Sequence, residues 1–217
     1  MPISVHRAVR PSRTFTLKSV AETLYATPCT TFQNPGNKDW PVTVTEVDLR
    51  ELVRTIHDFP KPGIAYRDIT PLLSDAAALR AVVDSIANRF RGEVDAVVGI
   101  ESRGFIIGAP VAYALGTGLT LVRKAGKLPS EVVSEDYELE YGSDSLEIHS
   151  DALATGVRTL LVDDLLATGG TAAATVTLVE GLGAEVTACA FVIELEALGG
   201  RGRLSPCPTF SLIQYSD

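Results

Sequence analysis

Residues 158–175 (RTLLVDDLLATGGTAAAT) constrain the fold more than any other part of the chain. An apolar run at 160–162 ends in the acidic pair Asp163 and Asp164, a loop of small residues follows at 167–171, and helix-forming residues begin directly after it. Such a succession of buried strand, tight loop and helix is typical of α/β folds that contain a parallel sheet.

The small-residue loop, with Ala167 at its start, predicts a phosphate site. Gly169 and Gly170 let the backbone approach a ligand closely and adopt positive φ. The first amides of the following helix lack partners and carry the positive end of the helix dipole, which favours an anion. Thr168 and Thr171 add hydroxyl donors. The alternative is an ordinary strand-to-helix turn with capping residues.

The two carboxylates upstream of the loop suit a different group. Asp163 and Asp164 cannot bind a phosphate, but they suit vicinal hydroxyls, either directly or through a hard divalent cation such as Mg²⁺. A phosphate at one end and a diol at the other describe a ribose 5-phosphate. The segment therefore predicts a binding site for such a sugar.

The rest of the chain, from about residue 46, alternates helix-like and strand-like stretches, which predicts a mainly parallel sheet of about five strands flanked by helices. The expected helices are 47–56, 71–91, 105–115, with Pro110 near its first turn or bending it, and 171–182. The expected strands are 95–100, 119–122, 158–162, 186–193 and 210–215, with a hairpin over 137–149 and a loop at 123–135.

Composition excludes several classes of protein. The net charge of −8 argues against nonspecific binding of nucleic acid. No apolar run of about 18 residues is present, so we expect no membrane span. The three cysteines and three histidines are scattered, which indicates neither a disulfide framework nor a zinc site. Free cysteines indicate a reducing compartment, and we expect a cytoplasmic protein.

The first 44 residues do not share this pattern. They carry five Lys or Arg against two acids, and they lack sustained periodicity. We interpret 1–44 as an extension, flexible or loosely docked, and 45–217 as the folded domain. A basic targeting leader, or translated sequence upstream of the true start, are alternatives.

Four further segments, in order, resemble the adenine phosphoribosyltransferases, which are type I phosphoribosyltransferases. Together with the phosphate loop they cover about residues 46–217. They are similar to the family's base-binding hood, its pyrophosphate loop, its mobile catalytic loop and the hairpin that follows, and they comprise 59–73 (FPKPGIAYRDITPLL), 101–110 (ESRGFIIGAP), 122–129 (VRKAGKLP) and 139–142 (LEYG).

The resemblance implies the type I fold and a reaction of adenine with phosphoribosyl pyrophosphate that gives AMP and pyrophosphate. It implies that Arg103, Lys124 and Lys127, together with Mg²⁺, offset the charge on the departing pyrophosphate. Ser102 lies in the pyrophosphate loop, where family enzymes often have a cis peptide at the turn equivalent to Glu101–Ser102. The family also implies a homodimer.

The resemblance assigns the base site as well. Glu140, or alternatively solvent, moves a proton at the adenine ring, and Tyr141 positions pyrophosphate or shapes the closed loop. Adenine is expected between Tyr66, where the family commonly has Phe, and Leu165. Backbone atoms near Ala65 and Arg67 read the base edge.

Two alternatives to this function stay open from the sequence. One is a transferase that acts on 6-oxopurines. The other is a nucleotide-sensing regulator that kept the fold and lost catalysis. Such regulators usually carry a DNA-binding domain, and residues 1–44 show no clear helix-turn-helix. The Mg²⁺ ion is expected to bind mainly through the substrate, with Asp163 or Asp164 as protein ligands.

Overall fold

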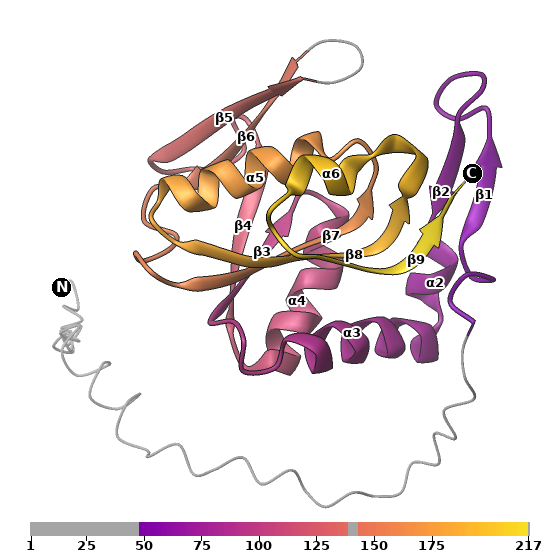
Figure 1. Cartoon of the computed structure of the whole chain (residues 1–217), viewed down its shortest axis with the longest axis horizontal. Coiled ribbons are helices and arrows are strands. Elements are labelled where there is room, and N and C mark those ends of the chain that lie inside the picture. The colour runs from indigo at the N-terminus through magenta and orange to yellow at the C-terminus, as the bar shows by residue number, and fades with distance from the viewer. Residues whose placement is uncertain (1–47, 139–142, 217) are drawn as a thin grey trace, which may run out of the picture. The chain divides into compact units, whose positions relative to one another are not determined.

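Seven strands form the central sheet, in the order β5-β6-β4-β3-β7-β8-β9 (Figure 1). The computed structural model describes residues 48–138 and 143–216. Five neighbouring strands are parallel, and β5 and β6 add an antiparallel hairpin along β4. The bounds are β3 (Ala96–Ile100), β4 (Gly118–Lys124), β5 (Val132–Glu138), β6 (Ser143–His149), β7 (Arg158–Leu166), β8 (Glu185–Leu195) and β9 (Thr209–Tyr215). The predicted α/β fold with a mainly parallel sheet is confirmed.

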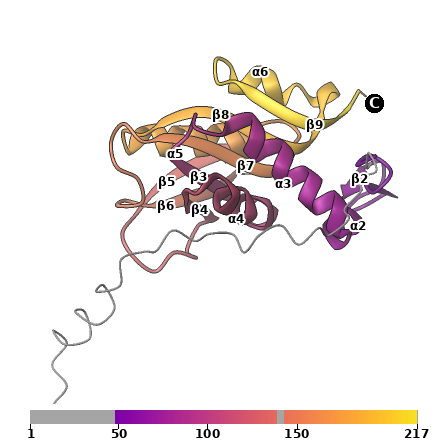
Figure 2. The same cartoon turned by 90° about the horizontal axis from the view of Figure 1, so that it is seen from below.

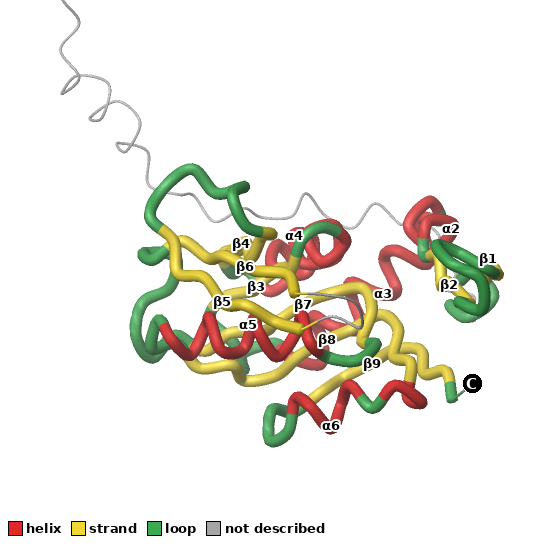
Figure 3. The backbone as a smooth tube through the Cα atoms, turned by 90° about the horizontal axis from the view of Figure 1, so that it is seen from above, coloured by secondary structure: helices red, strands yellow, loops and turns green. Residues whose placement is uncertain are grey.

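Helices cover both faces of this sheet. Helices α3 (Ala76–Phe90) and α4 (Arg103–Leu115) pack on one face (Figure 2), and α5 (Gly170–Gly181) and α6 (Gly200–Leu204) lie on the other (Figure 3). Successive residues of β7 pack into the cores on opposite faces of the sheet. Leu160 packs into the core under α3 and α4, whereas Leu161 packs into the core under α5. Burial on both faces explains why the strand is continuously apolar in sequence.

A separate two-stranded sheet, which we call the hood, precedes the main sheet in the chain. Strands β1 (Arg54–His57) and β2 (Ala65–Asp68) pair antiparallel. The predicted helix over 47–56 is therefore wrong. Backbone hydrogen bonds form turns over residues 48–53, and the chain then becomes extended and pairs with β2. Arg54 forms an ion pair with Asp68 of β2 at 2.5 Å. Pairing with the strand that follows in the chain overrides the local helical spacing.

The expected helix at 71–91 is two helices. The first, α2 (Thr70–Ser74), ends before Asp75, and the carboxylate of Asp75 accepts hydrogen bonds from the amides of Ala77 and Ala78 at the start of α3. An N-cap of this kind begins a new helix because it satisfies amides that have no partner within the helix. Pro110 lies inside α4, since this helix begins at Arg103 and not at residue 105.

Several strands are longer than predicted. Strand β7 continues to Leu166, so Asp163 and Asp164 lie within the strand and not in a turn after it. Strand β4 reaches Lys124 and β5 begins at Val132, which shortens the predicted loop of 123–135 to 125–131. The short helices η1 (Glu196–Leu198) and α6 were not predicted. Within the described residues, no helix has the length and apolar character needed to cross a membrane.

Candidate active site

The site lies where the carboxyl ends of β3 and β7 meet. These strands are adjacent and parallel, and the helices that leave them, α4 and α5, lie on opposite faces of the sheet. Such a reversal of crossover direction leaves a crevice beyond the strand ends, where α/β proteins bind their ligands. The acidic pair and the small-residue loop open into this crevice from β7, and residues 101–103 open into it from β3.

A cavity of about 390 Å³ occupies the crevice, a volume suited to a small-molecule ligand. An adjoining cavity of about 90 Å³ lies over the loop and is also lined by Thr168, Gly169 and Gly170. The larger cavity brings together eight of the predicted site residues, which are Ser102, Arg103, Lys124, Asp163, Asp164, Leu165, Ala167 and Thr171. Four residues that were not predicted also line it: Glu101, Tyr137, Asp144 and Leu146.

The loop at 167–171 has the backbone that a phosphate site needs. Gly169 has φ of +79° and stands as the N-cap of α5, with no side-chain cap bonded to the first amides of the helix. Helix α5 is 12 residues long, so its N-terminus carries a developed dipole. The open amides and the dipole together favour an anion in the smaller cavity.

Arg103 joins the acidic pair to the hood. Its Nε donates to Asp164 Oδ2 at 2.5 Å, and a second nitrogen of the guanidinium donates to the hydroxyl of Tyr66. The carboxylate of Asp164 is almost fully buried, whereas the Arg103 side chain is 37% exposed on the cavity side. The guanidinium is thus held at the cavity wall, within reach of an anionic ligand.

Lys124, at the end of β4, and Lys127, in the loop that follows, are both paired with acids. Lys124 Nζ lies 2.9 Å from Asp144 Oδ2, and Lys127 forms an ion pair with Glu101. Burial opposes the ionisation of Glu101, but hydrogen bonds from Lys127 and from the amide of Lys124 outweigh it and lower the pKa of this carboxyl. Both lysines are about half exposed, so an incoming anion can compete for them.

The two aspartates of β7 differ in environment. Burial, and then the charge of Asp164, raise the pKa of Asp163 well above its ordinary value, although its Oδ1 accepts the amide of Asp164 at 2.8 Å. Gly104 explains part of this burial, because a Cβ there would lie 2.6 Å from the carbonyl oxygen of Val162 and 3.0 Å from Asp163 Oδ1. The glycine lets the start of α4 approach the end of β7.

The hood contributes an aromatic face near the cavity. The Tyr66 ring packs edge-on against Phe59 at 5.2 Å and reaches the cavity through its bond to Arg103. The Arg67 side chain is used elsewhere, since it lies 3.9 Å over the Tyr215 ring and donates to Thr55 Oγ1 at 2.7 Å. Only backbone atoms at this position are therefore available to read a base.

The Glu101–Ser102 peptide is cis, as the resemblance implied. Glu140 and Tyr141 fall outside the described residues, and Ala65, Tyr66, Arg67 and Lys127 do not line the two cavities directly. The signal for Asp144 and Tyr137 was present in the sequence, because both belong to the predicted hairpin. Their contribution depends on how this hairpin folds over α5, which periodicity does not reveal.

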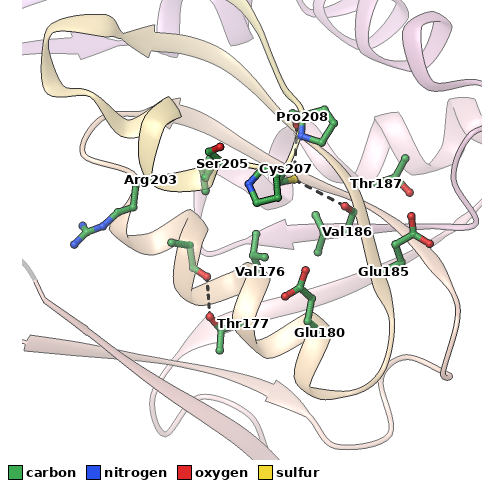
Figure 4. Close-up of a pocket in the computed structure, with 13 residues that line it drawn as sticks. Val176, Thr177, Glu180, Glu185, Val186, Thr187, Arg203, Ser205, Cys207 and Pro208 are labelled. Atoms are coloured by element: carbon green, nitrogen blue, oxygen red, sulfur yellow. Dashed lines mark hydrogen bonds between the residues drawn. The ribbon is translucent and has the colours of Figure 1, made fainter.

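A further cavity, of about 520 Å³, lies outside this site, between α5, the start of β8 and the segment after α6 (Figure 4). Cys207 lines it and lies 3.6 Å from Cys189, and both are free thiols.

Comparison with known proteins identifies relatives along most of the chain. Residues 69–208 match the family model of the phosphoribosyl transferase domain. The adenine phosphoribosyltransferase of Methylobacillus flagellatus is 56% identical over 174 residues, which cover 79% of this chain and 99% of that protein.

Solved structures agree with this result. The adenine phosphoribosyltransferase of Thermoanaerobacter pseudethanolicus is 49% identical, with a TM-score of 0.75 over 77% of this chain and 98% of that one. The Saccharomyces cerevisiae enzyme, solved with adenine and an imino-altritol bisphosphate, is 40% identical, with a TM-score of 0.73 over 76% and 96%.

Proposed function

The chain belongs to the adenine phosphoribosyltransferase family, and we infer from this that it transfers the 5-phosphoribosyl group of phosphoribosyl pyrophosphate to adenine, giving AMP and pyrophosphate. The observation that carries the inference for this chain is the shared crevice. One segment, 163–171, supplies an acidic pair and an anion cradle, and two others supply the cations Arg103 and Lys124, around two adjoining cavities of about 390 and 90 Å³. A phosphorylated, pyrophosphorylated sugar requires these three groups.

We propose that the loop at 167–171 binds the 5-phosphate of the sugar. The positive φ of Gly169 and the uncapped start of α5 support this role. The ribose hydroxyls would then reach the acidic pair, since Asp163 lines both cavities.

The acidic pair also fits a role in holding Mg²⁺. Among the described residues, no group of three or more His, Cys, Asp or Glu side chains could hold a metal by itself. Mg²⁺ commonly binds through one or two carboxylates and completes its shell with substrate oxygens and water, and the oxygens of Asp163 and Asp164 suit this arrangement. When bound, the ion neutralises charge on the pyrophosphate.

The cations around the cavity are proposed to stabilise the departing pyrophosphate. Bond breaking at C1 of the sugar moves negative charge onto the leaving group, and Arg103, Lys124 and Lys127 would offset it. Their present partners, which include Glu101 and Asp144, orient these side chains. Exchange of a protein carboxylate for pyrophosphate then completes the site, with Ser102 at the pyrophosphate turn.

The base is proposed to lie between Tyr66 and Leu165. Leu165 lines both cavities at the end of β7, and Tyr66 is fixed by Phe59 and Arg103. Backbone groups near Ala65 and Arg67 would pair with the amino group and N1 of adenine. Glu140, or solvent, would move the proton at the ring, and Tyr141 would contact pyrophosphate.

We propose that the enzyme is a cytoplasmic homodimer. Helix α4 presents Ile106 and Tyr113 to solvent, and the tyrosine is 87% exposed. A large exposed apolar surface on one helix is typical of a contact between copies. The two free thiols suit a reducing compartment.

The function is tested by mixing the purified protein with adenine, phosphoribosyl pyrophosphate and Mg²⁺. We expect AMP and pyrophosphate to form in equal amounts. A Gly169→Val variant serves as the matched control. The valine backbone does not tolerate the positive φ of this position, and its Cβ would collide with the carbonyl oxygen of Gly200. Equal rates of AMP formation in the two proteins would contradict the placement of the phosphate in this loop.

A further inference from the structure

The phosphate loop is in direct backbone contact with α6, a helix that the sequence did not predict. A Cβ atom added to Gly200 would overlap the carbonyl oxygen of Ala167 and lie 3.0 Å from the amide nitrogen of Gly169. In the other direction, a Cβ on Gly169 would lie 2.7 Å from the carbonyl oxygen of Gly200. Neither position has room for a side chain. The backbones of α6 and the loop are therefore in van der Waals contact, and a shift of α6 would shift the loop.

An ion pair between the half-exposed Arg201 and a buried carboxylate holds α6 in that place. The Glu194 carboxylate, at the end of β8, is 4% exposed and accepts two hydrogen bonds from Arg201, one of them at 2.9 Å. Arg201 also donates to the carbonyl oxygen of Thr209 at 2.7 Å. These bonds tie α6 to both β8 and β9.

The ion pair stands next to the loop along the sheet. Glu194 is in register with Leu166, the last residue of β7 before the loop. The hydrogen bond from Arg201 lowers the pKa of Glu194 and keeps it charged. A buried charge of this kind is strongly unfavourable once its partner is removed, so the pair fixes its own geometry.

The other flank of α6 offers less support. The segment that follows the helix, with Ser205 and Cys207, borders the open cavity of about 520 Å³ (Figure 4). Leu204 is the buried apolar anchor on this side. A helix of five residues does not hold its position by backbone hydrogen bonds alone, so its position depends on Leu204 and Arg201.

We propose that Gly200 and the Glu194–Arg201 pair are positioning residues for the phosphate subsite. They set the backbone of the loop at 167–171 so that its amides converge on the 5-phosphate. This inference rests on the proposed function. The contact involves Leu166, Ala167 and Gly169, and not the base-site residues Tyr66 and Leu165, so it should affect affinity for phosphoribosyl pyrophosphate more than the steps at the base.

The test compares Gly200→Ala with Gly202→Ala. Gly202 lies in the same helix, and a Cβ there meets no atom within 4 Å. We expect Gly200→Ala to raise KM for phosphoribosyl pyrophosphate by about tenfold to a hundredfold, the scale of a misplaced binding group. At saturating phosphoribosyl pyrophosphate, kcat and KM for adenine should stay within about twofold, and Gly202→Ala should match the wild type. Equal KM values in the two variants would overturn the proposal.

A second variant covers the case in which Gly200→Ala does not fold. Glu194→Gln keeps the side-chain shape and removes the charge, and it should raise KM for phosphoribosyl pyrophosphate with an unchanged KM for adenine. Folded Glu194→Gln protein with wild-type KM values would overturn the role of the ion pair. If the wild type itself makes no AMP, the proposed function fails and this inference with it. An active wild type with unaffected variants removes the positioning role alone.

Discussion

Asp164→Asn separates the structural and functional uses of the acidic pair. Two unit charges about 4 Å apart interact by about 4 kcal/mol at an effective dielectric of 20. Arg103 is 37% exposed, so water screens part of this attraction, and the asparagine oxygen still accepts a hydrogen bond. We therefore expect the free energy of unfolding to fall by about 1–2 kcal/mol. For a domain of this size the melting temperature falls by about 2–8 °C.

The kinetic effect of Asp164→Asn should be larger than this loss of stability implies. Removal of a charged partner of the ribose hydroxyls or of Mg²⁺ is worth about 1.5–3 kcal/mol, so kcat/KM for phosphoribosyl pyrophosphate should fall by about 10- to 100-fold. The assay is steady-state kinetics at a temperature where denaturant titration shows the variant to be folded.

A matched control is Asp95, which directly precedes β3 and pairs with Arg158, the first residue of β7. Asp95 pairs with Arg158 at 2.7 Å, but both side chains are about half exposed. Asp95→Asn should leave the kinetics unchanged and cost less stability than Asp164→Asn. A folded Asp164→Asn enzyme with kcat/KM within about twofold of the wild type would refute the reasoning, because a factor of two corresponds to less than about 0.5 kcal/mol.

Four further predictions follow from the site. Burial raises the pKa of Asp163 well above its ordinary value, so ionisation of this carboxyl lowers the stability of the folded protein. Asp163→Asn should therefore raise the free energy of unfolding at pH 7 by about 0.5–2 kcal/mol while it lowers activity. The gain should disappear as the pH falls below the ordinary value of 3.8, and a gain independent of pH contradicts the assignment. Glu140→Leu should lower kcat by about tenfold or more with KM nearly kept, and an unchanged limb of the pH–rate profile would mean that solvent moves the proton. Tyr66→Ala should raise KM for adenine by about 2- to 10-fold through lost stacking, whereas Ala65→Ser, which keeps the backbone, should change it little. Deletion of residues 1–40 should leave a folded, active enzyme, and an insoluble product in a solubility and activity assay would contradict the reading of this segment as an appendage.

The parts of the fold that the sequence predicted are those set by local rules. The run at 160–162 is apolar on successive residues because β7 is buried on both faces, and Gly169 gives the loop the positive φ with which it enters α5. These local requirements were enough to predict the strand, loop and helix at 158–175 and the parallel sheet.

The errors come from pairing that the local spacing does not contain. The spacing at 47–56 is helical, yet residues 54–57 pair with β2, which begins only at residue 65, outside that stretch. Asp163 and Asp164 follow the apolar run, which indicated a turn, but the register with β8 extends the strand through them.

The site shows the same limit. Sequence motifs predicted the cations Lys124 and Lys127, but not their partners Asp144 and Glu101, because each ion pair joins segments whose distance in space depends on the fold. The contact of Gly200 with the phosphate loop was missed for the same reason. The sequence shows that residue 200 is a glycine, but it does not show which other segment of backbone packs against this position.

The choice of base tests the central claim most directly. Adenine presents an amino donor and an N1 acceptor, whereas a 6-oxopurine presents the reverse pattern, so a buried backbone edge matched to one leaves mispaired groups with the other. The measurement is kcat/KM for adenine, hypoxanthine and guanine, with saturating phosphoribosyl pyrophosphate and Mg²⁺. The account predicts that adenine is preferred by about 10⁴-fold or more. Comparable efficiency with hypoxanthine or guanine, or no AMP from adenine at all, would contradict it.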